Sequence, residues 1–399
     1  MSATTAERPV TERTADEPEN PLANLTTEQL EQLGREFDAI HDEVYADLGD
    51  RDARYIRSTI KLHRHLVLAS RLLLMGSRKR PLWLAGTTAL SLAKILENME
   101  IGHNVMRGQW DWMNDPDINS QNWDWDTASP ADAWRHSHNY EHHTFTNIRG
   151  KDRDLGYEIM RIDPHQKWHP VYLLQPFYNL LLMGFFEWGV AMHDLNRGAI
   201  HSGEKSKEQV LEELKAIGVK ARDQIVKDYA AFPALSALAA LATSRGSVAS
   251  GRSSFKSTMT ANFTANIVRN MWAYSIIFCG HFPDQTYTFS EEEVADETRG
   301  GFYVRQLLGS ANIDGGPVFH LLAGNLSFQV EHHLFPDMPS SRYAEIAPRV
   351  RDICRRYGLP YNTGPLHKQL GTVHRTILRL AFPGGRSRPK PGPYRPSEV

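Results

Sequence analysis

The first regular pattern of apolar residues along the chain predicts an amphipathic helix. Thr26 and Gln29 have the spacing of a capping box, in which each side chain bonds the backbone of the other residue. Apolar side chains then recur every three or four residues, at Leu30, Leu33, Phe37, Ile40, Val44 and Leu48. This spacing predicts a helix of about five turns that ends at Gly49 and either packs on the main domain or lies on a membrane surface.

Five longer apolar runs follow, at residues 66–75, 82–105, 171–192, 229–243 and 265–282. Val171–Met192 is the best candidate for a membrane span, because 22 residues of helix reach roughly 33 Å, enough to cross a bilayer core. Tyr229–Thr243 is too short to span comfortably. Between the runs we expect a charged helix at 202–228 and a Ser/Gly/Arg loop at 244–258.

Two features of these runs leave the topology open. Arg78, Lys79 and Arg80 should favour the cytoplasmic side, yet they would lie on the far side if both flanking runs crossed the membrane. The mean hydropathy of −0.46 is also that of a soluble chain. Residues 1–23 and the Pro/Arg-rich tail at 384–399 are expected to be disordered, and the chain opens without a signal peptide.

Composition limits the chemistry. A net charge of −2 gives no bulk attraction to nucleic acid. The two cysteines, Cys279 and Cys354, build neither a disulfide framework nor a thiolate metal cluster, which indicates a reducing compartment. With 18 histidines, a metal site in this chain must be rich in imidazole, a ligand that suits iron, zinc and copper alike.

Histidines cluster at three places beside the apolar runs. The clusters contain His103, then His138, His142 and His143, and finally His332 and His333 after Gln329. On a helix His138 and His142 face the same way while His143 is rotated by about 100°, so one helix can feed two metals. One such pair alone is equally well explained as a solvated surface pair; two pairs in matching contexts favour metal binding.

The clusters resemble the motifs of the membrane fatty-acid desaturase family. HNYEHH at 138–143 matches the family's HxxxHH box and is followed by Thr144 and Asn147, and FQVEHHLFP at 328–336 matches its (H/Q)xxHH box. GHNVM at 102–106 and FCGHFPD at 278–284 are also similar to bacterial acyl desaturases, and the resemblance covers about residues 40–360.

The resemblance implies an all-α fold of integral membrane helices with a cytosolic helical cap that carries the histidine boxes. Residues 24–75 would form the entry helices and 76–360 the desaturase domain, in a multi-pass protein of the cell membrane whose active site faces the cytoplasm. The implied activity is O2-dependent insertion of a double bond into a fatty acyl chain, carried as an acyl-CoA or by a lipid. Two iron ions would be held by seven residues: His103, His138, His142, His143, His281, His332 and His333.

Electrons should come from a separate protein. The chain has no His-Pro-Gly-Gly cytochrome b5 motif, no GxGxxG dinucleotide motif and no cysteine pattern for an iron–sulfur cluster. A ferredoxin, a rubredoxin or a flavin reductase is the expected donor.

Arg107 departs from the family pattern. The first box is normally HxxxH or HxxxxH, and Arg107 stands where the second histidine is expected. A guanidinium stays protonated and has no lone pair to offer a metal, so the centre should be impaired. Asp111, and less directly Glu100, are the expected partners that would draw this charge aside.

Three alternatives remain. A ferritin-like di-iron bundle needs two Glu-x-x-His motifs, and only Glu100 to His103 matches. A weak or inactive desaturase fold that binds lipid or a partner protein is favoured by Arg107 alone. A hydroxylase on the same scaffold would share every ligand.

Overall fold

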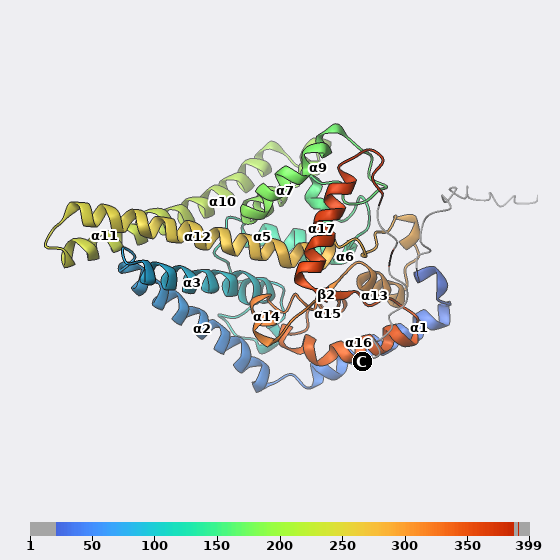
Figure 1. Ribbon diagram of the computed structural model, residues 1–399. Helices are drawn as coiled ribbons and strands as arrows, with labels where there is room; N and C mark the ends of the chain where they lie inside the picture. Colours follow the sequence, from blue (N-terminus) through green and yellow to red (C-terminus); the bar gives the residue numbers. More distant parts are fainter. Residues whose placement is uncertain (1–20, 387–389, 391–399) are drawn as a thin grey trace, which may run out of the picture.

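Long helices form the extended part of the molecule. The computed structural model describes residues 21–386 and 390, so the expected disorder at residues 1–20, 387–389 and 391–399 lies outside the described residues. Figure 1 shows the long helices projecting from a compact base that contains most of the short elements. The projecting helices are α2 (Asp50–Met75), α3 (Arg80–Leu96), the C-terminal part of the α10 (Lys207–Ile225), η7 (Val226–Ala231) and α11 (Phe232–Thr243) helix, and α12 (Val248–His281).

The base is built from the N-terminal helix and the C-terminal third of the chain. Its elements are α1 (Thr27–Ala46), α13 (Arg299–Leu308), α14 (Pro317–Leu322), α15 (Gln329–Leu334), η9 (Ser340–Arg342), α16 (Tyr343–Arg356) and α17 (Leu366–Leu380). Two short parallel strands, β1 (Asn312–Asp314) and β2 (Thr363–Pro365), pair between them. Buried side chains of α1, α13, α15 and α16 make one continuous apolar core.

The N-terminal helix forms as its sequence predicts. The Thr26 hydroxyl accepts the Gln29 N–H at 3.2 Å, and the Gln29 side chain accepts the Thr26 N–H at 2.9 Å. Its apolar stripe is buried against the base, so packing on the domain is the correct alternative. The expected disorder up to residue 23 is wrong at its end, because Pro21–Asn24 forms a 3-10 helix (η1).

The predicted span Val171–Met192 is not one helix. It is divided into η6 (Pro170–Leu174), α7 (Gln175–Gly184) and α8 (Phe186–His193). Phe185, between α7 and α8, has the non-helical angles φ −122° and ψ 37°. The longest piece, with 10 residues, is only about 15 Å long, which is too short to cross a bilayer.

One helix among the described residues is long and apolar enough to cross a membrane by length and composition, and it is Lys207–Thr243. It joins the expected charged helix to the run Tyr229–Thr243, which looked too short by itself. The expected loop at 244–258 is wrong for most of its length, because α12 begins at Val248 after the Ser247 side chain caps it. The fold class is mostly helical as expected; a multi-pass arrangement is a proposal taken up below.

The remaining elements connect these parts. They are η2 (Glu97–His103), α4 (Asn104–Met106), η3 (Asp111–Met113), α5 (Ala131–Trp134), η4 (Arg135–His142), α6 (His143–Phe145), η5 (Leu155–Glu158), α9 (Arg197–Ser202) and η8 (Glu292–Val294).

Candidate metal centre

The seven predicted histidines come from five separate elements. His103 is the last residue of η2, His138 and His142 lie on η4, and His143 opens α6. His281 is the last residue of α12, and His332 and His333 lie on α15. All seven are buried, with at most 8% of each residue exposed.

Two of these elements are π-helices. A π-helix is wider than an α-helix, so side chains at a given spacing face one another differently. Both η2 and η4 are π-helices, a conformation that often marks functional sites. In η4 the rings of His138 and His142 stack with centroids 5.2 Å apart and planes 23° apart. The His143 ring lies nearly perpendicular to that of His138, at 87°, so it turns toward the other side of the cluster.

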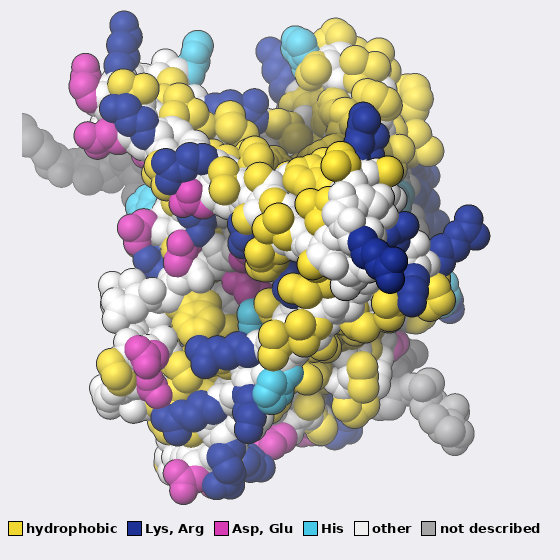
Figure 2. Space-filling view, turned by 90° about the vertical axis from the view of Figure 1, so that its left-hand side faces the viewer, with side chains coloured by type: hydrophobic (Ala, Val, Ile, Leu, Met, Phe, Trp, Pro, Cys, Tyr) yellow, Lys and Arg dark blue, Asp and Glu magenta, His cyan; other side chains and the backbone are white. Residues whose placement is uncertain are grey.

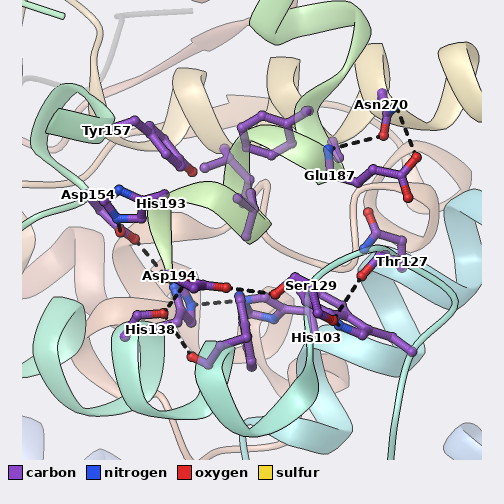
Figure 3. A pocket seen from close by; sticks show the side chains of 18 of the residues that line it. His103, Thr127, Ser129, His138, Asp154, Tyr157, Glu187, His193, Asp194 and Asn270 are labelled. Carbon is purple, nitrogen blue, oxygen red and sulfur yellow. Dashed lines mark hydrogen bonds and ion pairs between the residues drawn. The ribbon is translucent and has the colours of Figure 1, made fainter. Parts of the chain in front are cut away.

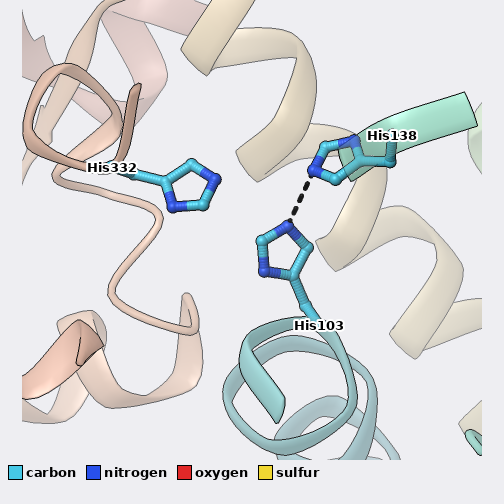
Figure 4. A group of neighbouring side chains, drawn as sticks. All are labelled: His103, His138 and His332. Atoms are coloured by element: carbon cyan, nitrogen blue, oxygen red, sulfur yellow. Dashed lines mark hydrogen bonds between the residues drawn. The ribbon is translucent and has the colours of Figure 1, made fainter. Parts of the chain in front are cut away.

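The histidines form three overlapping groups in which one ligand atom of each residue lies within 4.8 Å of the others. The first is His103, His138 and His332 (Figure 4). The second is His142, His281 and His333, and the third is His143, His332 and His333. Since His332 and His333 each occur in two groups, the three groups form one continuous cluster.

Polar neighbours hold the outer nitrogen of most rings. His103 Nδ1 bonds Asn104 Oδ1 at 2.9 Å, and His333 Nδ1 bonds Gln306 Oε1 at 2.9 Å. His142 Nδ1 lies 3.1 Å from both carboxylate oxygens of Asp152. His332 Nδ1 lies 3.2 Å from the Tyr343 hydroxyl. A ring that donates from Nδ1 presents the Nε2 lone pair to the centre, which is how second partners orient histidine ligands.

Several ring nitrogens that face the centre have no hydrogen-bond partner among the described residues. They are Nε2 of His142, His332 and His333, both nitrogens of His143, and Nδ1 of His281. His281 is the exception in orientation, because its Nε2 instead receives a hydrogen bond from Gln329 Nε2 at 2.9 Å. Buried polar atoms are rarely left without a partner. These nitrogens therefore have the arrangement that a bound metal would satisfy.

Burial keeps most of these imidazoles neutral. It lowers the pKa of His103, His143, His281, His332 and His333 well below the ordinary value, and that of His138 to about 4. For His142 burial acts in the same direction, but the carboxylates of Asp152 and Asp154 outweigh it and raise the pKa. Neutral imidazole is the form that binds metals, and a ligand paired with a carboxylate is made more basic.

Comparison with known proteins agrees with this geometry. Residues 81–365 match the family profile described as fatty acid desaturase. The NADPH-dependent stearoyl-CoA 9-desaturase of Mycobacterium tuberculosis is 46% identical over 362 residues, covering 91% of this chain and 82% of that protein. This chain belongs to the fatty acid desaturase family.

A second relative is more distant, and no solved structure is significantly similar to this chain. The sn-1 linoleoyl-lipid 6-desaturase of Synechocystis sp. is 27% identical over 297 residues, covering 72% of this chain and 77% of that protein. Membership of this family of oxidoreductases excludes the ferritin-like bundle. The glutamate on which that alternative rested, Glu100, instead receives hydrogen bonds from the side chains of Tyr55, Asn325 and Ser340.

Arg107 lies beside the histidine cluster of this desaturase without a hydrogen-bond partner for its buried Nε atom among the described residues. Its positive charge helps to lower the pKa of His143, His103 and His332, after burial and together with neighbouring rings. The expected pairing with Asp111 is wrong, because that carboxylate accepts hydrogen bonds from the backbone and hydroxyl of Ser120 at 2.7 and 2.6 Å. Glu100 is likewise engaged elsewhere. Tyr343 and Asp337 are instead the neighbouring groups that favour the protonated form of Arg107.

A cavity adjoins the cluster on one side. It is lined by His103, His138 and His281 and by aromatic and aliphatic side chains including Trp125, Trp134, Tyr157, Phe186, Ile277 and Phe282. Figure 3 shows its polar side chains, with Asp194, Ser129 and His138 along one wall and Glu187 and Asn270 along another. Trp125 and Trp134 line this cavity, whereas Trp110 is fully buried in the protein core.

Sequence reasoning missed four side chains that support the cluster. Asp154 lies 3.7 Å from Nδ1 of both His138 and His142, and it accepts a hydrogen bond from His193 Nε2 at 2.8 Å. His193 is therefore a buried part of this network. Gln306, which holds His333, carried no signal at all. For Asp152 and Asp154 the only signal was their position shortly after the second histidine box.

Proposed function

We propose that this chain is an O2-dependent fatty acyl desaturase whose seven buried histidines hold two iron ions. The observation that carries the proposal is the convergence of His103, His138, His142, His143, His281, His332 and His333, with unpartnered ring nitrogens facing the centre. Imidazole-rich sites suit iron, and the family to which the chain belongs is generally iron-dependent. The first two ligand groups share no residue, which supports two ions rather than one.

One ion would be held by His103, His138 and His332, and the other by His142, His281 and His333, with His143 beside both. When bound, iron supplies the redox chemistry that activates O2 toward an unactivated methylene. The protein's own side chains prepare the site. Asp152, Gln306, Asn104 and Tyr343 fix ring orientation through Nδ1, and burial keeps the imidazoles unprotonated.

The substrate would be an acyl chain bound in the cavity beside His103, His138 and His281. Its aromatic and aliphatic wall excludes water from the methylene groups, and its contact with both ligand groups brings a chain close to both ions. The overall reaction joins one CH2–CH2 unit, O2, two electrons and two protons to give one double bond and two water molecules. The electrons would come from a separate ferredoxin, rubredoxin or flavin reductase.

The acyl chain would be carried as a coenzyme A thioester or a lipid ester. The 46% identical relative is named as a stearoyl-CoA desaturase and favours the thioester. The more distant one is named for a lipid-linked substrate. Purified acyl-CoA and phospholipid substrates, offered separately to the iron-loaded protein with a reducing partner, would distinguish the two.

We further propose that the projecting helices cross the cell membrane and that the histidine cluster faces the cytoplasm. Large apolar side chains are exposed along these helices, including Leu68 and Leu72 of α2, Leu238 of α11 and Phe263 of α12. The spanning parts would lie between the helix tips and the level of Lys94 and Arg269, so the seven histidines would lie outside the bilayer. Cysteine labelling near Thr144 and Pro336 from the two sides of the membrane tests this; opposite accessibility of the two positions would exclude it.

Arg107 supports a second candidate, a desaturase fold of low activity that binds lipid or a partner protein. Its guanidinium is close enough to lower the pKa of three of the proposed ligands and would oppose bound iron. A hydroxylase would use the same ligands and differ only in its product. Lipid profiles of cells with and without the gene, in the presence of a redox partner, decide among these. More unsaturated chains support the desaturase, hydroxylated chains the hydroxylase, and no change the low-activity protein.

A further inference from the structure

The projecting helices contain no acidic residue over two long stretches of sequence. Asp and Glu are absent from residues 53–96, which include most of α2 and all of α3, and from residues 229–283, which include α11 and α12. Lys and Arg residues do occur in these two stretches. Six of them lie at or near the two turns that end these helix pairs: Arg78, Lys79, Arg80, Arg245, Arg252 and Lys256.

The α2–α3 turn is held against α12 by hydrogen bonds. The hydroxyls of Ser77 and Thr258 lie 3.1 Å apart, and the Ser257 hydroxyl donates to the Ser77 carbonyl at 2.8 Å. The indole N–H of Trp83 donates to the Ser257 carbonyl at 3.0 Å. These contacts join the α2–α3 turn to α12, so the six cations belong to one end of the molecule. We call this end the basic tip.

The charge of the basic tip is not neutralised within the described part of the protein. All six side chains are exposed, and none makes an ion pair with another described residue. Figure 2 looks onto this end of the molecule and shows Lys and Arg side chains next to hydrophobic surface. Six like charges on one surface repel one another, so they need an anionic partner.

The distance from the basic tip to the base matches a lipid bilayer. Along α2, Arg64 and Arg78 are separated by roughly 20 Å of helix, and along α12, Arg252 and Arg269 by roughly 25 Å. Both are somewhat shorter than the hydrocarbon core of about 30 Å. The exposed side chains of Arg64, Arg78 and Arg252 are long enough to close this gap by reaching outward to the headgroups, whereas Arg269 is buried beside Glu187. The exposed apolar side chains lie between the two charged levels.

We propose that the basic tip binds anionic phospholipid headgroups in the leaflet away from the histidine cluster. The inference rests on the membrane insertion suggested under the proposed function. Lys and Arg usually favour the cytoplasmic side of a membrane, but Arg78, Lys79 and Arg80 would lie on the opposite side. Direct contacts with anionic headgroups explain how they are held there. Each cation close to an anionic surface should strengthen the contact roughly fivefold.

Energy transfer in nanodiscs tests the proposal with the full chain. Val248, which is 77% exposed beside the basic tip, is replaced by cysteine and labelled with a donor fluorophore; Cys279 and Cys354 are buried. The nanodiscs contain a trace of acceptor-labelled phosphatidylglycerol or, separately, acceptor-labelled phosphatidylcholine. We expect several-fold stronger transfer to phosphatidylglycerol. The combined variant Arg78→Gln, Arg80→Gln, Arg245→Gln and Arg252→Gln should abolish this preference, while replacing the same four residues by Lys should retain it.

A matched control removes four exposed cations elsewhere, through Lys167→Gln, Lys207→Gln, Lys368→Gln and Arg379→Gln, and should keep the preference. Equal loss in this control, or equal transfer to both lipids in the natural chain, would overturn the proposal. With desaturation intact, either result would leave the proposed function standing. Absence of transfer to both lipids, together with release of the protein without detergent, would overturn membrane insertion as well.

Discussion

At the scale of single residues, Arg107 is the side chain most at odds with the chemistry of its surroundings. It brings a permanent positive charge to a cluster of neutral imidazoles, and neither Asp111 nor Glu100 pairs with it. Burial lowers the pKa of Arg107 to about 10, which still leaves it protonated at neutral pH. In the proposed metal centre Arg107 would stand where a ligand is expected and would make the neighbouring histidines less basic, so the two metal positions should differ in affinity.

Arg107→His should therefore increase both iron content and desaturation. Losing a residue that binds the metal directly should lower metal affinity or activity by more than the roughly 10–100-fold caused by replacing a residue that only orients a ligand. The measurement is iron per chain and product per time for the variant beside the natural protein. Arg107→Lys is the control, because it keeps the charge and should restore neither quantity. High and equal activity in the natural and histidine proteins would mean that another group supplies the missing ligand.

Asp152→Asn should weaken iron binding by about 10–100-fold, since a carboxylate that orients a ligating histidine is replaced by an amide. Asp152 accepts from His142 Nδ1 and from the Asn147 N–H, so the variant also loosens the turn after α6. Iron affinity is measured by competition with a chelator, and Asp352→Asn on the surface is the control. Unchanged affinity would show that Asp152 serves only the fold.

The seven candidate histidines could be read from the sequence, and the side chains that hold them in place could not. Paired histidines at fixed spacing carry a local signal, and all seven predicted residues lie in one cluster. Asp154, Gln306 and His193 acquire their roles from segments that meet only after folding. The same holds for Arg107. Its spacing from His103 showed that it replaces an expected histidine, but only the fold shows that Asp111 and Glu100 bond other residues.

At the scale of elements, a capping motif in the sequence predicted a helix correctly, whereas a long run of apolar residues did not. The helix after Thr26 begins where its capping box indicates. Val171–Met192 has the length and composition of a span, yet it is interrupted at Phe185, and composition alone carries no signal for such a break. The start of α12 was missed because Ser, Gly and Arg are common in loops, while here the small residues Gly251 and Ser254 allow α11 and α12 to pack closely.

Gly300→Ala should strongly destabilise the docking of α1 on α13. A Cβ atom at Gly300 would lie 1.9 Å from the Leu30 carbonyl oxygen, a backbone atom that cannot move without shifting the helix. We expect a loss of at least about 2 kcal/mol in the free energy of unfolding, as for other overpacked sites. Denaturant unfolding in detergent measures it.

Gly218→Ala is the matched control for Gly300→Ala. It is also a helical glycine, but its new Cβ would have no neighbour within 4 Å, so about 0.5–1 kcal/mol of stabilisation is expected. Equal effects of the two substitutions would show that α1 and α13 are not packed as closely as described.

At the scale of the whole molecule, a buried set of charges joins the two helix pairs that project from the base. Asp228, which precedes α11, lies 2.8 Å from Lys94 of α3 and 3.2 Å from Arg71 of α2. Asn262 of α12 accepts a hydrogen bond from Arg71 at 2.7 Å. Buried charges need such partners. None of these pairings is visible in the sequence, since the residues lie far apart in the chain.

Asp228→Asn should therefore loosen the bundle by about 3–5 kcal/mol, because it leaves Lys94 and Arg71 buried without their carboxylate. The double variant Asp228→Asn with Lys94→Met should recover part of the loss. Unfolding in detergent, monitored by helical circular dichroism, measures both proteins. A single variant as stable as the natural chain would show that water reaches these groups.

An anomalous diffraction map of the iron-loaded protein, recorded at the iron edge, tests most directly whether the seven histidines bind two iron ions. We predict two peaks, one among His103, His138 and His332 and the other among His142, His281 and His333, with the first weaker because of Arg107. If crystals of fully iron-loaded protein show a single anomalous peak, or iron only outside this cluster, the seven histidines do not bind two iron ions.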